Sequence, residues 1–522
     1  MPHPESSIER PIELLFETQT LRPDELLEAA QSLLDDLGDT PSAHGRMQCA
    51  YALRDAEGQL WVRYIISQGA NQPWGIWSVD ASSGTLPSLA NVLPLLGWYE
   101  REIQDLYGIT FTDHPEPYPL VLHEGFIPAK PPLQKGFDAK AEPIRGQAEP
   151  FAEANMVGSD IQRLPFGPIR ADVVESAQFV FHYIGEGILH YHPRLFYKHR
   201  AMEARFEGVP ISAACVLAER VSGVDSVAHV LAFSQAMEAA LGWQAPLRAQ
   251  AWRVVLAELE RLYNHLQFFG HLAKTTTLKV AEAEGIWLEE QVKQINGRLT
   301  GSRFLRGMIV PGGLRRDLDA TALIADLNAL QPQIEDYLDT LANTRSYLDR
   351  LLTTGVLPRQ VAFDQGATGP IERASDLDRD LRRDHGYALY PELQFAVPTA
   401  TEGDADARAR VRDQEIRQSL HLIRQALNKL EPGPICRKEQ TIDPPMDGVM
   451  EGMGLGWAEA VRGGLIYAVH WNAKTERLTR VKIKEPSFSN WRVFPFTVND
   501  SNMMDYAINE ASFGLSVAGA DR

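Results

Sequence analysis

Long stretches of helical character constrain the fold of this 522-residue chain more than any other feature. Residues 317–352 repeat apolar side chains at the spacing of a helix that buries one face, and residues 246–273 form a second predicted long helix. No window of about 18 uninterrupted apolar residues occurs, so we expect no membrane span. The second part of the chain is therefore predicted to be a large, mainly helical unit.

The first 130 residues follow a different pattern. Acidic residues just after Pro23 predict a helix start over residues 23–30, and the partly alternating residues 60–66 predict a strand. Residues 131–160 are rich in Pro, Gly, Glu and Ala without a clear period, which is typical of a linker. We therefore predict an α+β chain: a small mixed α/β domain over 1–130, a linker over 131–160, and a mainly helical domain with flanking β-structure over 161–522.

Composition limits the cofactors and partners. The formal net charge of −18 and the pI near 5.3 argue against nucleic acid, because phosphate binding needs clustered Lys and Arg. Three cysteines are present, Cys49, Cys215 and Cys436, far apart in sequence. A thiolate-held metal cluster typically needs about four, so we expect no cofactor bound by this chain. The same cysteine usage predicts reduced thiols in a cytoplasmic setting, and the N-terminus has no signal-peptide pattern.

A glycine-rich stretch covers residues 452–457. It reads Gly-Met-Gly-Leu-Gly-Trp, which is not the G-x-G-x-x-G pattern of a dinucleotide site. It also does not open a strand–turn–helix unit. The sequence thus gives little support for NAD binding by this chain.

Residues 97–109, Gly-Trp-Tyr-Glu-Arg-Glu-Ile-Gln-Asp-Leu-Tyr-Gly-Ile, carry the first family resemblance. With Phe111 and His114-Pro115 they resemble the "WxEREVxDLFGIxFxxHP" signature of the 30-kDa subunit of respiratory complex I. Two interpretations of the charged positions Glu100, Arg101, Glu102 and Asp105 remain open. They form either a solvated helix face with i,i+4 pairs or a docking surface, which the resemblance favours.

Two further segments resemble the metal-binding loops of nickel–iron hydrogenase large subunits. Residues 217–229 are similar to "DRVCGICGFAH", with Ser222 and Asp225 at the two cysteine positions. Residues 512–522 are similar to "SLDPCYSCTDR", with Ser516 and Gly519 at the cysteine positions. Additional segments match the same large-subunit patterns: 194–203, 258–265, 299–315, 459–463 and 480–488.

The order of these segments resembles the large subunit of membrane-bound group 4 hydrogenases, the hydrogenase-4 and formate hydrogenlyase type. It also resembles the fused 30-kDa/49-kDa (C/D) subunit of bacterial complex I. Serine hydroxyls are hard ligands and glycine offers none, so the four positions would suit at most a weakly held hard cation. We therefore expect no hydrogenase activity and no resident nickel–iron centre.

The complex I relatives form a quinone-headgroup pocket in this region. Their usual histidine and tyrosine contacts fall here on Val174 and Gly223, so both polar contacts are replaced. We expect that the pocket takes a quinone, a different ligand, or no ligand at all.

Several polar residues around the vacated ligand positions are candidates for a cavity or proton relay. The resemblance implies that Glu203 is a proton relay; the alternative is a structural ion pair that holds two helices together. Arg200 lies about one helical turn from Glu203. Asp225 is the second candidate acid. His229 is either a base or an ordinary core histidine, and Arg522 ends the chain with its carboxylate near the site.

The resemblance implies a cytoplasmic subunit held on the inner membrane by its partners. Those partners are an iron–sulfur small subunit, similar to the complex I B subunit, and antiporter-like membrane subunits. Electrons would pass from the partner's iron–sulfur cluster to a quinone-like acceptor, coupled to ion translocation. The competing interpretation is a redox-silent scaffold. A Glu203→Gln change that lowers turnover without loss of assembly would support the first.

Overall fold

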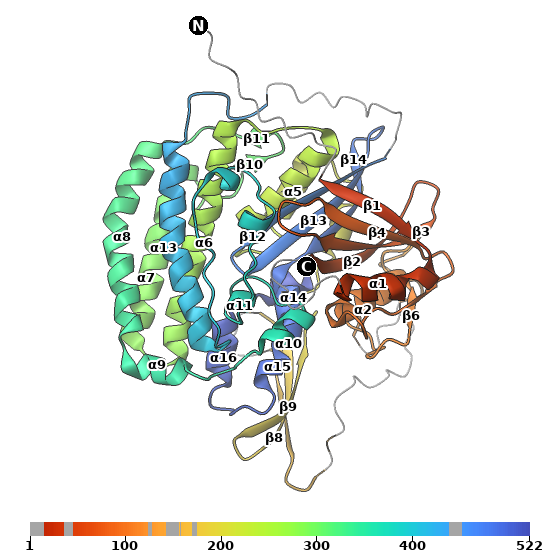
Figure 1. Cartoon of the computed structure of the whole chain (residues 1–522), viewed down its shortest axis with the longest axis horizontal. Helices are drawn as coiled ribbons and strands as arrows, with labels where there is room; N and C mark the ends of the chain where they lie inside the picture. The colour runs from red at the N-terminus through yellow and green to blue at the C-terminus, as the bar shows by residue number, and fades with distance from the viewer. Residues whose placement is uncertain are drawn as a thin grey trace.

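The computed structural model describes residues 15–35, 45–123, 128–141, 156, 158–169, 175–437 and 451–522. A three-stranded sheet lies at the centre, a bundle of long helices covers one side, and a second sheet with two helices covers the other (Figure 1). The predicted α+β class is confirmed. Within these ranges no helix is both long enough and apolar enough to cross a membrane.

The N-terminal unit is built on a four-stranded sheet in the order β1-β4-β3-β2, in which β1 runs parallel to β4 and the other pairs are antiparallel. The strand predicted at residues 60–66 is confirmed as β3. The helix start predicted near Pro23 is a short 3-10 turn, Pro23–Glu25, that continues into α1. The elements of this unit are β1 Phe16–Leu21, α1 Leu26–Asp35, β2 Arg46–Arg54, β3 Leu60–Ser67, β4 Trp74–Asp80, β5 Thr85–Pro87, α2 Gly97–Tyr107 and β6 Thr110–Thr112.

The central sheet consists of β12 Glu451–Ala460, β13 Gly463–Asn472 and β14 Arg477–Lys484, all antiparallel. Helix α5, Ser226–Leu241, lies directly on β12. A Cβ atom at Gly454 would lie 1.8 Å from the carbonyl oxygen of Ala236, and one at Gly456 would lie 2.1 Å from that of Ala232. The glycine-rich stretch therefore serves close helix–sheet packing, which sequence reasoning missed.

The helical bundle contains α6 Leu247–Thr275, α7 Lys279–Thr300, α8 Ala320–Ala342 and α13 Ala405–Asn428. The long helix predicted over 246–273 is confirmed as α6. The single helix predicted over 317–352 is wrong, because α8 ends at Ala342 and α9, Arg345–Leu351, starts anew. At the break the Asn343 amide and the Thr344 hydroxyl donate to carbonyls of the last α8 turn, and such side-chain bonds compete with helix continuation.

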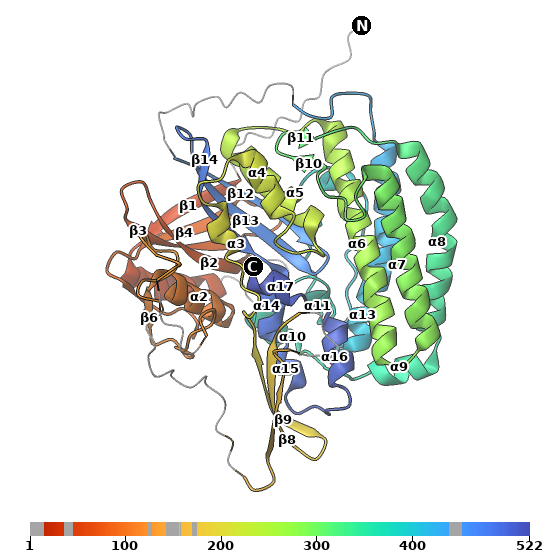
Figure 2. The same cartoon turned by 180° about the vertical axis from the view of Figure 1, so that it is seen from behind.

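A three-stranded sheet, β7-β8-β9, projects away from the body at the lower end of the molecule (Figures 1 and 2). Short helices and strands join the bundle, this projection and the central sheet. They are β7 Gln162–Phe166, β8 Gln178–Ile184, β9 Gly187–Arg194, α3 Met202–Phe206, α4 Ile211–Ala218, β10 Ile309–Val310, β11 Gly313–Leu314, α10 Arg359–Asp364, α11 Pro370–Arg373, α12 Leu381–Asp384, α14 Pro486–Val493, α15 Pro495–Val498, α16 Tyr506–Phe513 and α17 Val517–Asp521.

Buried charges join the N-terminal unit to the central sheet. Glu102 of α2 accepts a bond of 2.5 Å from the Lys482 ammonium of β14 and pairs with the C-terminal Arg522. Nearby, the Tyr51 hydroxyl lies 3.0 Å from Nε2 of His470. One hydrophobic core runs through both units. Glu102 is thus an internal docking residue.

The other acids of α2 are buried as well, so the solvated-face interpretation is wrong. The Glu100 carboxylate accepts from the Ser88 hydroxyl and the Leu89 amide. The Asp105 carboxylate accepts from three consecutive amides, those of residues 120–122. These acids organise loops of their own unit, which a helical-wheel argument could not reveal.

Candidate functional site

The two segments with vacated ligand positions lie side by side, although almost three hundred residues separate them in sequence. Arg200 joins them: its Nη2 donates to the carbonyl oxygens of Val221, at 2.5 Å, and of Ala518, at 2.9 Å. Ser222 and Asp225 lie on the loop between α4 and α5, and Ser516 and Gly519 lie at the start of α17. Figure 2 shows α4, α5 and α17 grouped around the C-terminus.

Asp225 is buried and ion-paired. Its carboxylate lies 3.2 Å from Nη1 of Arg462, which comes from the turn between β12 and β13. The Ser222 hydroxyl is 3.4 Å from the same carboxylate, and the Arg462 Nε donates to the Gly514 carbonyl. Asp225 therefore already has a cation of the chain as its partner.

The C-terminal pair of positions is closed by a different acid, Glu485. A Cβ atom at Gly519 would lie only 2.5 Å from Oε1 of Glu485, so the carboxylate occupies the space of a side chain there. Glu485 is held in place, since it accepts from the Ser487 hydroxyl and the Phe488 amide. The Ser516 hydroxyl accepts from the Gly519 amide and serves as the cap of α17.

Two further buried acids, Glu485 and Glu260, lie near Asp225. Burial, and then the negative charge of Asp225, raise the pKa of Glu485 to about 8. The same two causes raise the pKa of Glu260, whose carboxylate accepts from the Val227 and Ala228 amides at the start of α5. At neutral pH this interior therefore stores protons on carboxyl groups.

Glu203 lies in a separate cluster of three cations. Its carboxylate is 2.7 Å from Nη2 of Arg480, 3.2 Å from the Lys482 ammonium and 3.7 Å from Nη1 of Arg522. Burial opposes ionisation, but these charges outweigh it and hold the pKa of Glu203 well below its usual range. Glu203 therefore forms structural ion pairs, as the alternative to a proton relay expects. The pairs join α3 to β14, a helix to a strand, and they do not involve Arg200. A group that remains ionised is poorly suited to take up and release protons.

His229 is fully buried, and its Nδ1 lies 2.8 Å from the Tyr467 hydroxyl. Its Nε2 has no hydrogen-bond partner among the described residues. Burial, with a smaller effect of Arg200, lowers the pKa of this imidazole to about 3, so it is neutral at physiological pH. The geometry favours the core-histidine interpretation.

The Glu258–Arg261 pair on α6 is present at 3.2 Å and belongs to a larger buried network with Glu415. It lies within the bundle and stabilises helix packing. Arg522 is also buried, and its side chain pairs with Glu102 and Glu203. A Cβ atom at Gly223 would lie 3.9 Å from Nη2 of Arg306, and Val174 lies outside the described residues.

A nickel–iron centre does not fit these residues. No thiolate is present at the four positions, Asp225 is neutralised by Arg462, and Glu485 fills the space beside Gly519. Among the residues that the structure describes, no group of three His, Cys, Asp or Glu is arranged to hold a metal ion. The chain has replaced a ligand set with its own ion pair and carboxyl groups.

Sequence reasoning missed Glu485, Arg462 and Glu260 as members of this site. The sequence offered one signal. Residues 480–488 resemble the large-subunit pattern "RxKIRaPSF", which has an alanine where this chain has Glu485. The chain thus has a glutamate at 485 and a glycine at 519, where the patterns that it resembles have an alanine and a cysteine. That relation becomes interpretable only once the two positions are known to touch.

Comparison with known proteins agrees with this architecture. Residues 19–143 match the family of the respiratory-chain NADH dehydrogenase 30 Kd subunit, and residues 286–522 match that of the 49 Kd subunit. Residues 200–286 match the nickel-dependent hydrogenase family. The fold and the interior site therefore define a large-subunit-like protein of the nickel–iron hydrogenase and complex I group.

Full-length relatives refine that class. Formate hydrogenlyase subunit 5 and hydrogenase-4 component G, both of Escherichia coli (strain K12), are each 29% identical to the chain. Each match covers 90% of this chain. The matches cover 83% of formate hydrogenlyase subunit 5 and 82% of hydrogenase-4 component G. The C/D subunit of NADH-quinone oxidoreductase from Cereibacter sphaeroides is 26% identical, over 85% of this chain and 83% of that relative. The chain is thus similar to these hydrogenase subunits and to fused C/D subunits, and it has no cysteine at positions 222, 225, 516 and 519.

Proposed function

We propose that the protein is a subunit of a membrane-bound, complex I-like oxidoreductase assembly. The observation that carries this proposal is the extent of the match: relatives from such complexes align with 85–90% of the chain, across both units. The chain itself has no described transmembrane helix. Its attachment to a membrane would therefore depend on partner subunits.

In this proposal a partner subunit, and not this chain, carries the electron-donating cluster. An iron–sulfur small subunit packs near the α4–α5 loop and the C-terminus, and antiporter-like membrane subunits couple the reaction to ion translocation. A quinone-like acceptor takes electrons from the partner's cluster at the interface. The chain's contribution is a preformed, buried set of carboxyl groups around Asp225, of which Glu485 holds a proton at neutral pH.

One observation favours the second candidate, a redox-silent coupling scaffold. The former ligand positions are filled by the Asp225–Arg462 pair and by Glu485, which leaves less room for a ligand there. A subunit that has lost its ligands and filled the space can still transmit conformational strain to a membrane arm.

Purification from membranes in mild detergent separates the two. The purified complex is analysed for partner subunits by mass spectrometry, for iron by elemental analysis, and for quinone reduction with an artificial electron donor. Iron in a small subunit together with quinone reduction supports the redox function. Membrane subunits without iron and without reduction support the scaffold. Recovery of the chain alone from the soluble fraction contradicts both.

A further inference from the structure

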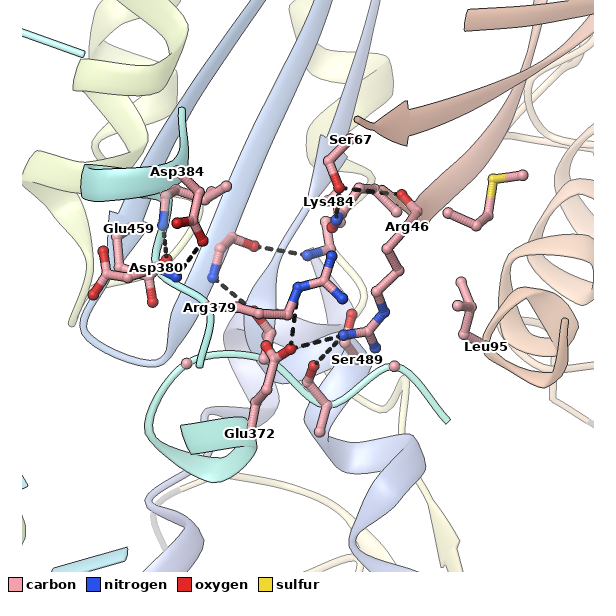
Figure 3. A pocket seen from close by; sticks show the side chains of 18 of the residues that line it. Arg46, Ser67, Leu95, Glu372, Arg379, Asp380, Asp384, Glu459, Lys484 and Ser489 are labelled. Carbon is pink, nitrogen blue, oxygen red and sulfur yellow. Dashed lines mark hydrogen bonds and ion pairs between the residues drawn. The ribbon is translucent and has the colours of Figure 1, made fainter. Parts of the chain in front are cut away.

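A cavity of about 430 Å³ lies where the N-terminal unit meets the second unit, a volume within the range of small-molecule sites. Figure 3 shows its walls. Arg46 and Tyr99 come from the first unit, and Lys484, Phe488 and Arg492 come from the second. Ser222, Asp225 and Gly519 do not line it, so it is distinct from the interior site described above.

Every carboxylate in the wall already has a cation. Glu372 lies 3.0 Å from Nη1 of Arg46 and 3.5 Å from Nε of Arg379 (Figure 3). The other four acids pair with arginines in or behind the wall: Asp378 and Asp384 with Arg383, Asp380 with Arg382, and Glu459 with Arg373. Each acid of the wall therefore contacts at least one arginine, and Asp378 and Asp384 share Arg383.

Two cations of the wall, Lys484 and Arg492, have no carboxylate partner among the described residues. Lys484 is 3% exposed, and its ammonium donates to the Gly464 carbonyl at 3.0 Å. Arg492 uses its Nε on the Gln365 side chain, at 3.1 Å. Neither forms an ion pair with any carboxylate of the described residues. Burial lowers the pKa of Lys484 to about 8 and that of Arg492 to about 10.

The other residues of the cavity indicate what kind of anionic ligand would fit beside these two cations. Leu95, Tyr99 and Phe488 give it an apolar side. Asp378 and Arg383 are exposed, so the wall that they form reaches the surface. We propose that this cavity binds a small organic anion, whose carboxylate or phosphate head lies against Lys484 and Arg492 and whose apolar body lies against Tyr99 and Phe488.

Calorimetric titration of the purified full chain tests the proposal. Benzoate and phenyl phosphate are the aromatic probes. Acetate and inorganic phosphate test binding of the carboxylate or phosphate group without the aromatic ring. Chloride salt keeps the ionic strength constant. We expect one saturable site for at least one aromatic probe, bound more tightly than its head alone. The carboxylate and phosphate arms identify the preferred head. Absence of saturable binding for all four probes overturns the proposal.

A matched pair of variants localises the site. Lys484→Met keeps the length of the side chain and removes the charge, and should weaken the preferred probe at least about tenfold, the value of one charge-assisted contact. Lys274→Met makes the same change at an exposed lysine at the end of α6 and should bind as the parent does. Equal binding by Lys484→Met and the parent overturns the assignment.

A second measurement, chemical labelling of lysines, uses the parent protein. It therefore tests the proposal even if Lys484→Met does not fold. Pyridoxal 5′-phosphate carries a phosphate and an aldehyde that forms an imine with a nearby lysine amine, releasing water; borohydride then reduces the imine. Mass spectrometry should find Lys484 labelled, and the preferred aromatic anion should suppress that labelling while Lys274 labelling is unchanged. Failure of Lys484 to react, or labelling undiminished by the anion, contradicts the proposal.

Discussion

The Glu485 carboxylate and the backbone of Gly519 are in direct contact: a Cβ atom at position 519 would lie 2.5 Å from Oε1 of Glu485. The acid comes from the start of α14, and the glycine lies in the first turn of α17. One residue has given up its side chain, and another fills that space. A ligand side chain placed at position 519 would therefore collide with this carboxylate.

Gly519→Ala should destabilise the protein. Alanine normally favours a helix over glycine, but here its methyl group meets a buried, hydrogen-bonded carboxylate, and overpacking of this kind costs about 1–3 kcal/mol. Urea denaturation measures the change. Gly433→Ala is the control, since a Cβ there has no atom within 4 Å, and should stay within about 0.5 kcal/mol of the parent. A Gly519→Ala protein as stable as the parent would show that Glu485 moves freely.

Glu485 should make stability depend on pH. Because its folded pKa, about 8, lies above its unfolded value, the stability it contributes is complete below about pH 4.5 and is lost as pH rises through 8. Glu485→Gln should therefore flatten the fall in unfolding free energy between pH 5 and 8, by up to about 1.4 kcal/mol per pH unit.

Denaturation series at several pH values test this, with Glu57→Gln at an exposed position as the control. The control should keep the slope of the parent. An unchanged slope in Glu485→Gln would mean that the carboxyl group is ionised in the folded state, and the stored proton would be excluded.

We expect Glu203→Gln to lower the free energy of unfolding of the protein, and not only to affect proton transfer. The change leaves Arg480 and Lys482 without one buried counter-charge, and breaking such a pair costs about 3–5 kcal/mol. The pKa of Glu203 is lowered, so its stabilisation is present above its unfolded pKa and is lost as pH falls through the folded pKa. A stable Glu203→Gln complex with reduced turnover would instead restore the relay interpretation.

The His229–Tyr467 bond should have a measurable effect on stability. Tyr467→Phe removes the only hydrogen-bond partner of the imidazole among the described residues and should cost about 1–3 kcal/mol. Tyr64→Phe is a matched control, because the buried Tyr64 hydroxyl has no hydrogen-bond partner among the described residues, and should be near neutral. Similar losses in the two variants would argue against a structural role for the bond.

Much of the fold was predictable because its signals are local. Strand β3 and helix α6 follow from periodicity within one segment, since side chains repeat every two residues in a strand and every 3.6 in a helix. The break between α8 and α9 was missed because the apolar spacing continues across it. The domain boundaries at residues 130 and 160 stay predictions.

The sequence by itself determined that the metal ligands are absent, since composition alone shows too few cysteines and motif order shows where they would be. Only the tertiary structure decided what replaced them. Asp225 meets Arg462, Glu485 meets Gly519, and Glu102 meets Lys482, all across more than thirty intervening residues. No local pattern encodes such contacts, because the pairing of buried charges depends on which elements the core brings together.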